Sequence, residues 1–103
     1  MDMKPVKAKA MRRHAKEAAD FLRVLAHEAR LTVLCELVSG ERTAGELVKA
    51  SGLSQSALSQ HLARLRDEGL VATRREGQTI HYRLSDPRAV TIVSALHGVF
   101  CRS

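Results

Sequence analysis

The sequence predicts a mainly α-helical fold that carries one small β-hairpin. Apolar residues recur every three or four positions in segments 11–26, 31–38 and 90–100, which is the period of an amphipathic helix. Two short helical segments within 44–68 are separated by a turn that contains a glycine. Segment 70–84 then changes to the residue types of paired strands.

Length and composition restrict the chain to one small domain. It has 103 residues, of which 45% are hydrophobic and 27% charged, so a disordered or low-complexity chain is excluded. We expect a single domain over 1–103, with a basic, flexible arm over 1–10. No apolar run reaches the roughly 18 residues of a membrane span, and we expect neither a span nor a secretory signal. The two cysteines form no Cys-x-x-Cys pair, which excludes a disulfide scaffold and predicts a reducing, cytoplasmic location.

The first half of the chain predicts three helices. The first runs from Met11 to Ala26, and the second passes through Leu31 and Leu37 and stops at Gly40. Thr43 precedes Glu46 by three residues, which is the spacing of a capping box, and predicts a third, short helix that closes near residue 52.

The second half predicts a fourth helix, a hairpin and a fifth helix. Ser54 caps the fourth helix, which runs to about residue 68, with Leu58, Leu62 and Leu65 on one face and polar side chains largely on the others. Strands within 70–84 are divided by Glu76-Gly77-Gln78. The pair Asp86-Pro87 supplies a cap and a first helical residue for the last helix.

The order helix, helix, helix-turn-helix, hairpin, helix predicts a winged helix-turn-helix that binds double-stranded DNA. The net charge is +6, but residues 1–16 carry six basic side chains against one acidic, while the rest is nearly neutral. Binding therefore needs a local element, which the fourth helix and the wing supply. Three aromatic residues are too few for a single-strand stacking platform. The predicted DNA-binding residues are Gln55, Ser56, Ser59, Gln60, His61, Arg64, Arg74 and Arg75.

The polar face of the fourth helix is also compatible with a solvated surface or with a winged helix that binds protein. An enzyme is disfavoured, because the sequence has no phosphate-binding glycine loop, no paired carboxylates with metal-like spacing and no His-Glu-x-x-His motif.

The residues that carry these elements resemble the ArsR (ArsR/SmtB) family of winged-helix repressors. The family pattern is seen in LAHEARL at 25–31, GEL at 45–47, SQSALSQHL at 54–62, LRDEGLV at 65–71 and RREGQTIHY at 74–82. The resemblance covers nearly the whole chain. It implies a homodimeric repressor that leaves an inverted-repeat operator when an inducer binds.

Metal ligands of that family are missing at the corresponding positions. The arsenic- and cadmium-sensing type resembles a Cys-x-Cys pattern where this chain has Glu46-Leu47-Val48. The zinc- and nickel-sensing type uses Asp-x-His in the last helix, whereas Asp86 is followed two residues later by Arg88. His97 and Cys101, four residues apart, could supply only two ligands. We therefore predict no metal and no other cofactor.

The two cysteines resemble those of a sulfide- and persulfide-responsive branch of the family, of the BigR and SqrR type. Cys35 falls in the second helix and Cys101 at the end of the last, as in that branch. The resemblance implies a redox-sensing dithiol, whereas the residues alone favour two thiols that fill core space. His97 and Arg102 are the cations near Cys101, which favours it as the attacking thiol.

The sequence thus predicts a repressor that senses persulfides or polysulfides through Cys35 and Cys101 and releases its operator when sulfur links them. An activator or anti-repressor similar to HlyU, with redox-sensitive cysteines, and a metal-responsive repressor of the ArsR type are the alternatives.

Overall fold

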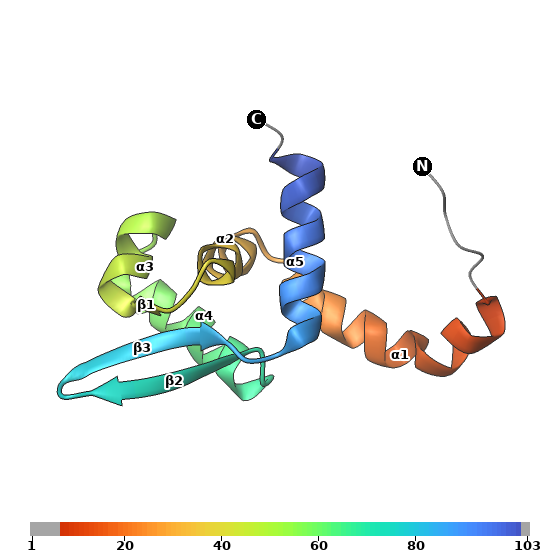
Figure 1. Ribbon diagram of the computed structural model, residues 1–103, viewed down its shortest axis with the longest axis horizontal. Helices are drawn as coiled ribbons and strands as arrows, with labels where there is room; N and C mark the ends of the chain where they lie inside the picture. The colour runs from red at the N-terminus through yellow and green to blue at the C-terminus, as the bar shows by residue number, and fades with distance from the viewer. Residues whose placement is uncertain (1–6, 102–103) are drawn as a thin grey trace.

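A computed structural model describes residues 7–101. Its elements follow the order α1 (Ala8–Leu25), α2 (Glu28–Val38), β1 (Arg42–Thr43), α3 (Ala44–Ser51), α4 (Gln55–Asp67), β2 (Val71–Glu76), β3 (Thr79–Leu84) and α5 (Pro87–Phe100) (Figure 1). The predicted class, mainly helical with a small β-hairpin, is confirmed. None of the helices in this described range is long and apolar enough to cross a membrane.

The predicted helix starts rest on local hydrogen bonds that are present. Thr43 and Glu46 form the reciprocal capping box at the start of α3, because the Thr43 hydroxyl accepts from Glu46 N and the Glu46 carboxylate accepts from Thr43 N. The Ser54 hydroxyl accepts from Ala57 N at 3.1 Å and caps α4. Asp86 caps α5 in the same way, with Pro87 at its first position.

Three details differ from the prediction. Residues 8–10 belong to α1 and not to a flexible arm, because alanines and lysines favour helix and continue it by three residues; residues 1–6 of the predicted arm lie outside the described residues. The hairpin turn is two residues long, since Glu76 pairs with Thr79 and Gly77 has a φ of 62°. A two-residue strand, β1, was not predicted.

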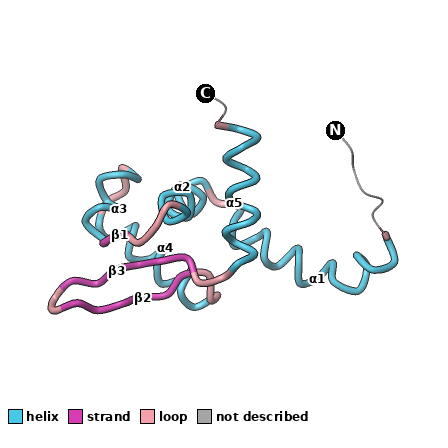
Figure 2. Tube along the Cα trace, in the orientation of Figure 1, coloured by secondary structure: helices cyan, strands magenta, loops and turns pink. Residues whose placement is uncertain are grey.

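The sheet has the strand order β1-β3-β2, and both pairings are antiparallel (Figure 2). β1 pairs Arg42 with Tyr82 and Thr43 with His81, so the loop between α2 and α3 is fixed to the side of the hairpin. The hairpin projects from the helical body as the wing.

One hydrophobic core unites the helices with the base of the hairpin. Its side chains come from α1, α2, α3, α4, β2 and α5 and from the residue before β2; they are Val24, Leu25, Val33, Leu34, Leu37, Leu47, Leu58, Leu62, Leu65, Leu70, Val71, Ala89 and Val93. The three leucines predicted for the packed face of α4 are all among them. The opposite face of α4 is consequently free.

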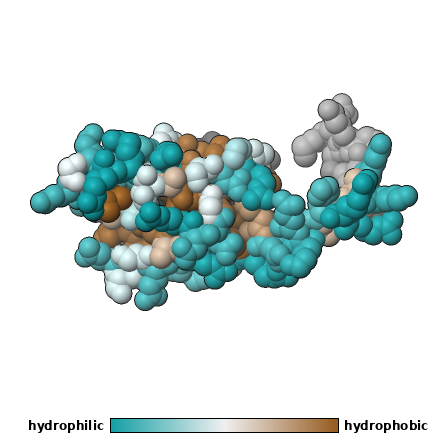
Figure 3. Space-filling view, turned by 90° about the horizontal axis from the view of Figure 1, so that it is seen from below, coloured by the Kyte–Doolittle hydropathy of each residue, from teal (hydrophilic) through white to brown (hydrophobic). Residues whose placement is uncertain are grey.

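Helix α1 extends away from the body of the molecule (Figure 1). Of its 18 residues, only Val24 and Leu25 are buried. The radius of gyration is 15.2 Å, above the roughly 13 Å typical of a compact chain of about 100 residues. From below, hydrophilic side chains cover most of the surface, the α1 side included (Figure 3).

Candidate DNA interface and dithiol

The free face of α4 presents a polar surface. Gln55, Ser56, Ser59 and Gln60 are all exposed there, while Leu58 and Leu62 hold the helix to the core from the other side. Amide and hydroxyl groups can donate and accept, so they can address both base edges and phosphates. The turn before the helix contains Gly52, whose φ of 72° lies in the left-handed region that glycine adopts readily.

His61 lies at the border of that face and is half-buried. Its ring centroid is 4.6 Å from that of His27, the residue that caps α2. Burial, followed by the charges of His27 and Arg30, lowers the pKa of His61. His61 is therefore less accessible than the four exposed polar residues, and its ring packs against the start of α2.

The predicted arginines differ in their surroundings. Arg64 is exposed and pairs with Glu68 at 3.3 Å. Arg74 and Arg75 are consecutive in β2 and point to opposite faces of the hairpin. Both are exposed, but Arg74 forms salt bridges with two carboxylates, whereas no salt bridge to Arg75 is found among the described residues.

The two predicted redox residues line one cavity between α2 and α5. It measures about 390 Å³, and both Cys35 and Cys101 border it. The remaining wall residues are mostly apolar, with a few polar ones near the thiols: Leu31, Thr32, Glu36, Val93, Leu96, His97 and Phe100. Both cysteines are free thiols.

The two thiols have unequal environments. Cys35 is half-buried, and burial is the main factor that raises its pKa, with smaller contributions from the negative charges of Cys101 and Glu36. Cys101 is exposed at the end of α5, where water can solvate a thiolate. Arg102, which the sequence places beside Cys101 as a cation, lies outside the described residues.

His97 and Cys101 remain two potential ligands at the rim of that cavity. Among residues 7–101, no group of three or more His, Cys, Asp or Glu side chains is arranged to hold a metal ion.

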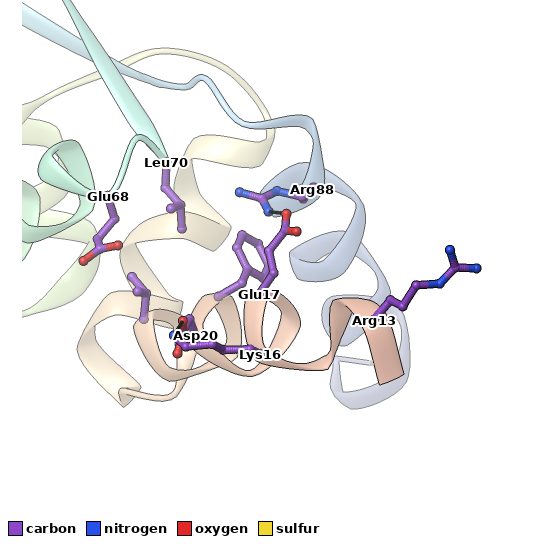
Figure 4. Close-up of a pocket in the computed structure, with 9 residues that line it drawn as sticks. Arg13, Lys16, Glu17, Asp20, Glu68, Leu70 and Arg88 are labelled. Atoms are coloured by element: carbon purple, nitrogen blue, oxygen red, sulfur yellow. Dashed lines mark hydrogen bonds and ion pairs between the residues drawn. The ribbon is translucent and has the colours of Figure 1, made fainter. Parts of the chain in front are cut away.

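A second cavity, of about 480 Å³, has a charged lining and separates α1 from the end of α4 and the start of α5 (Figure 4). Arg88 connects two of these elements: it donates to Glu17 at 3.0 Å and lies 4.8 Å from the centre of the Phe21 ring. Glu17 and Arg88 point toward each other, while Arg13 points away from them. Arg88, at the start of α5, thus contacts the middle of α1.

The sequence did not single out Glu41, Arg88 or the contact between His27 and His61. Their partners are distant along the chain, 33 residues for Glu41 and Arg74 and 71 for Glu17 and Arg88. The only signal in the sequence is the charge of each residue, and that signal does not select a partner.

Comparison with known proteins places these features in a family. Residues 27–73 match the family described as "Bacterial regulatory protein, arsR family". The chain is 42% identical to the transcriptional activator HlyU of Vibrio cholerae over 99 residues, which cover 96% of this chain and 92% of HlyU. It is 44% identical to the biofilm growth-associated repressor of Xylella fastidiosa over 91 residues, which cover 88% of this chain and 80% of the repressor.

Solved structures give the same assignment. The transcriptional repressor BigR from Xylella fastidiosa matches with a TM-score of 0.89 at 41% identity, covering 95% of this chain and all of BigR. Reduced HlyU from Vibrio cholerae matches with a TM-score of 0.85 at 44% identity, covering 91% of this chain and 99% of HlyU. Both are named as regulators of transcription, and neither is named as an enzyme.

Proposed function

The chain belongs to the ArsR family of bacterial regulatory proteins and is a DNA-binding transcriptional regulator, and from that premise we propose that it is a homodimeric, cytoplasmic repressor whose Cys35–Cys101 dithiol responds to persulfides. The observation that carries the proposal is that both cysteines border one cavity between α2 and α5. A sulfur bridge there would join the helix packed beside the recognition helix to the last helix.

The exposed polar face of α4 supports its role in the major groove. Gln60 and Gln55 can form paired hydrogen bonds with base edges, and Ser56 and Ser59 can bind bases or phosphates. Arg64 and Arg75 supply positive charge for the DNA backbone. Arg74 contributes less, because two carboxylates already bind its guanidinium. His61 belongs to this set only at its edge, because it is half-buried against His27.

The exposed apolar surface supports a dimer through α1 and α5. Leu22 is 53% exposed, and Val99 and Phe100 are 62% and 78% exposed. An apolar hollow of about 360 Å³ lies between the two helices and is lined in part by Ala18, Leu22 and Ile92. Leu25 of α1 and Val93 of α5 belong to the core and are not part of this exposed apolar surface.

Reaction with two persulfide molecules can link the two thiols. The Cys101 thiolate attacks the outer sulfur of a persulfide RSSH, and RS⁻ leaves, so that Cys101 carries the outer sulfur as a persulfide. A second RSSH extends this to a hydrotrisulfide. Attack by Cys35 on its middle sulfur expels HS⁻ and leaves a trisulfide between the helices. Two thiols and two RSSH become one trisulfide, two RSH and one H₂S, so the dithiol is oxidised and the persulfides are reduced.

Single variants test the mechanism. Cys35→Ser and Cys101→Ser should each bind the operator as tightly as the wild type but fail to release it when persulfide is added. The wild type should release it, and dithiothreitol should restore binding. Mass spectrometry of the released protein should find the two cysteines joined. Persulfide-driven release that survives in either variant would overturn the two-thiol mechanism.

A second candidate is activation by displacement of another DNA-binding protein. The observation in its favour is the 42% identity to a protein called transcriptional activator HlyU. A reporter downstream of the bound site distinguishes the candidates: deletion of the regulator raises expression for a repressor and lowers it for an anti-repressor.

A further inference from the structure

The guanidinium of Arg74 is bound by two carboxylates within the protein. Its Nη2 donates to Glu41 Oε1 at 2.9 Å, and its Nε lies 3.3 Å from both Glu41 oxygens. Its Nη1 donates to Glu76 Oε2 at 3.3 Å. Each of the three nitrogens thus has a carboxylate partner. A phosphate that approaches Arg74 must compete with Glu41, whose negative charge also repels it.

The position of Glu41 gives this contact a structural role. Glu41 immediately precedes β1 and follows the short loop after α2, which ends at Val38. β1 and β2 lie on opposite sides of β3, so the contact spans the width of the sheet from the α2–α3 loop to the wing. The Arg74 guanidinium holds the pKa of the Glu41 carboxyl below its ordinary value, which keeps the acceptor ionised.

Arg75 differs from Arg74 in the sheet face on which it lies and in its salt-bridge partners. The register pairs Arg74 with His81 and Arg75 with Ile80, and successive side chains of a strand point to opposite faces. Arg75 thus lies on the sheet face that begins with buried Val71, away from Glu41. It is exposed, and no salt bridge to it is found among the described residues.

We propose that Glu41 is a positioning residue for DNA recognition: it holds Arg74 as a strut that sets the orientation of the wing relative to α4, and it leaves Arg75 as the wing arginine that meets the phosphates. This assignment rests on the proposed DNA-binding surface of α4 and the wing.

The strut affects orientation more than stability. The side chains of Arg74 and Glu41 are 45% and 32% exposed, and partly exposed pairs contribute little to folding. The bidentate geometry nevertheless restricts the direction of both side chains. A variant that lacks the contact should consequently fold normally and bind DNA with a less defined wing.

Glu41→Gln tests the strut on the full-length dimer, with a duplex selected by the wild type from a random-sequence pool and an unselected duplex of equal length. Affinity for the selected duplex should fall several-fold. Affinity for the unselected duplex should stay or rise, because a negative charge is lost and Arg74 is freed. The slope of log affinity against log salt should stay or steepen by about one, since each phosphate neutralised contributes roughly 0.9. The melting temperature should not change.

Two comparisons separate the strut from a direct contact. Arg75→Gln should weaken binding to both duplexes and make the salt slope shallower by about one. Arg74→Gln should lower the affinity for the selected duplex as Glu41→Gln does, but it should not make the salt slope shallower. The exchange Glu41→Arg with Arg74→Glu should restore affinity for the selected duplex, because it rebuilds the ion pair with reversed polarity. Glu76→Gln, which removes the more exposed partner, should have the smaller effect.

Two results would overturn the proposal. In the first, Arg74→Gln makes the salt slope as shallow as Arg75→Gln does, and Glu41→Gln binds the selected duplex like the wild type. In the second, the exchange variant loses as much affinity for the selected duplex as Arg74→Gln does. Failure of the underlying DNA-binding surface would look different: replacement of Gln60 and Arg75 would also leave binding unchanged.

Discussion

The rings of His27 and His61 lie 4.6 Å apart, centroid to centroid, at an angle of 55°, and so connect the start of α2 with the recognition helix. His27 Nδ1 accepts a hydrogen bond from Ala29 N at 3.1 Å and caps α2. A neutral His27 in this role carries its proton on Nε2, because Nδ1 acts as the acceptor.

This contact predicts a loss of stability in mild acid. Burial lowers the pKa of His61 below its ordinary 6.5, so the unfolded chain binds more protons than the folded one in the window just below that value. The free energy of unfolding therefore decreases as the pH falls from about 6.5, and the full penalty is reached below the folded-state pKa. Chemical denaturation between pH 7.5 and about 5 measures it.

His61→Gln is the control for this effect, because it keeps a polar side chain that does not titrate. Its free energy of unfolding should vary less with pH in that window. The carboxylates of Glu41, Glu46 and Asp86, whose pKa values are lowered by their partners, lose their contribution only at more acidic pH. An equal dependence in wild type and variant would show that another group is responsible.

The recognition face predicts different roles for Gln60 and Arg75. Gln60→Ala should cost roughly 1 to 3 kcal/mol on the cognate operator and much less on random DNA, because a paired contact to a base is lost. Arg75→Ala should weaken both and flatten the salt dependence. Titration of both duplexes at several salt concentrations measures the difference. Equal losses on both for Gln60→Ala would mean that this residue does not read sequence.

Features that depend on neighbouring residues could be predicted from the sequence, and those that depend on tertiary placement could not. The capping box of Thr43 and Glu46 is a local pattern, and the buried stripe of α4 follows from helical periodicity. In contrast, Arg74 and Arg75 look equivalent in the sequence. The pairing of β2 with β3 places Arg74 on the face where Glu41 binds it, and it places Arg75 on the opposite face, where no salt-bridge partner is found within residues 7–101.

The exposed part of α1 predicts that a charge at Leu22 weakens dimer formation. Leu22→Glu should weaken association by more than about tenfold, because about 1.4 kcal/mol corresponds to a factor of ten and an unpaired charge buried in an apolar interface costs more. The helical content should stay the same, since Leu22 is exposed in the monomer. Sedimentation at micromolar concentration measures it. Lys49→Glu, on the exposed side of α3, should remain dimeric.

The unequal environments of the two thiols predict the order in which they react. Cys101 is exposed, while burial raises the pKa of Cys35 above its ordinary 9.0, and the thiolate is the nucleophile. At neutral pH, iodoacetamide should therefore modify Cys101 at least several-fold faster. The rates are measured separately in Cys35→Ser and Cys101→Ser by mass spectrometry, and unfolding in urea should make them nearly equal. The rate of Cys35 should continue to increase above pH 9, because its thiolate population is still growing there. Faster modification of Cys35 in the folded protein would reverse the roles and make it the thiol that attacks the persulfide first.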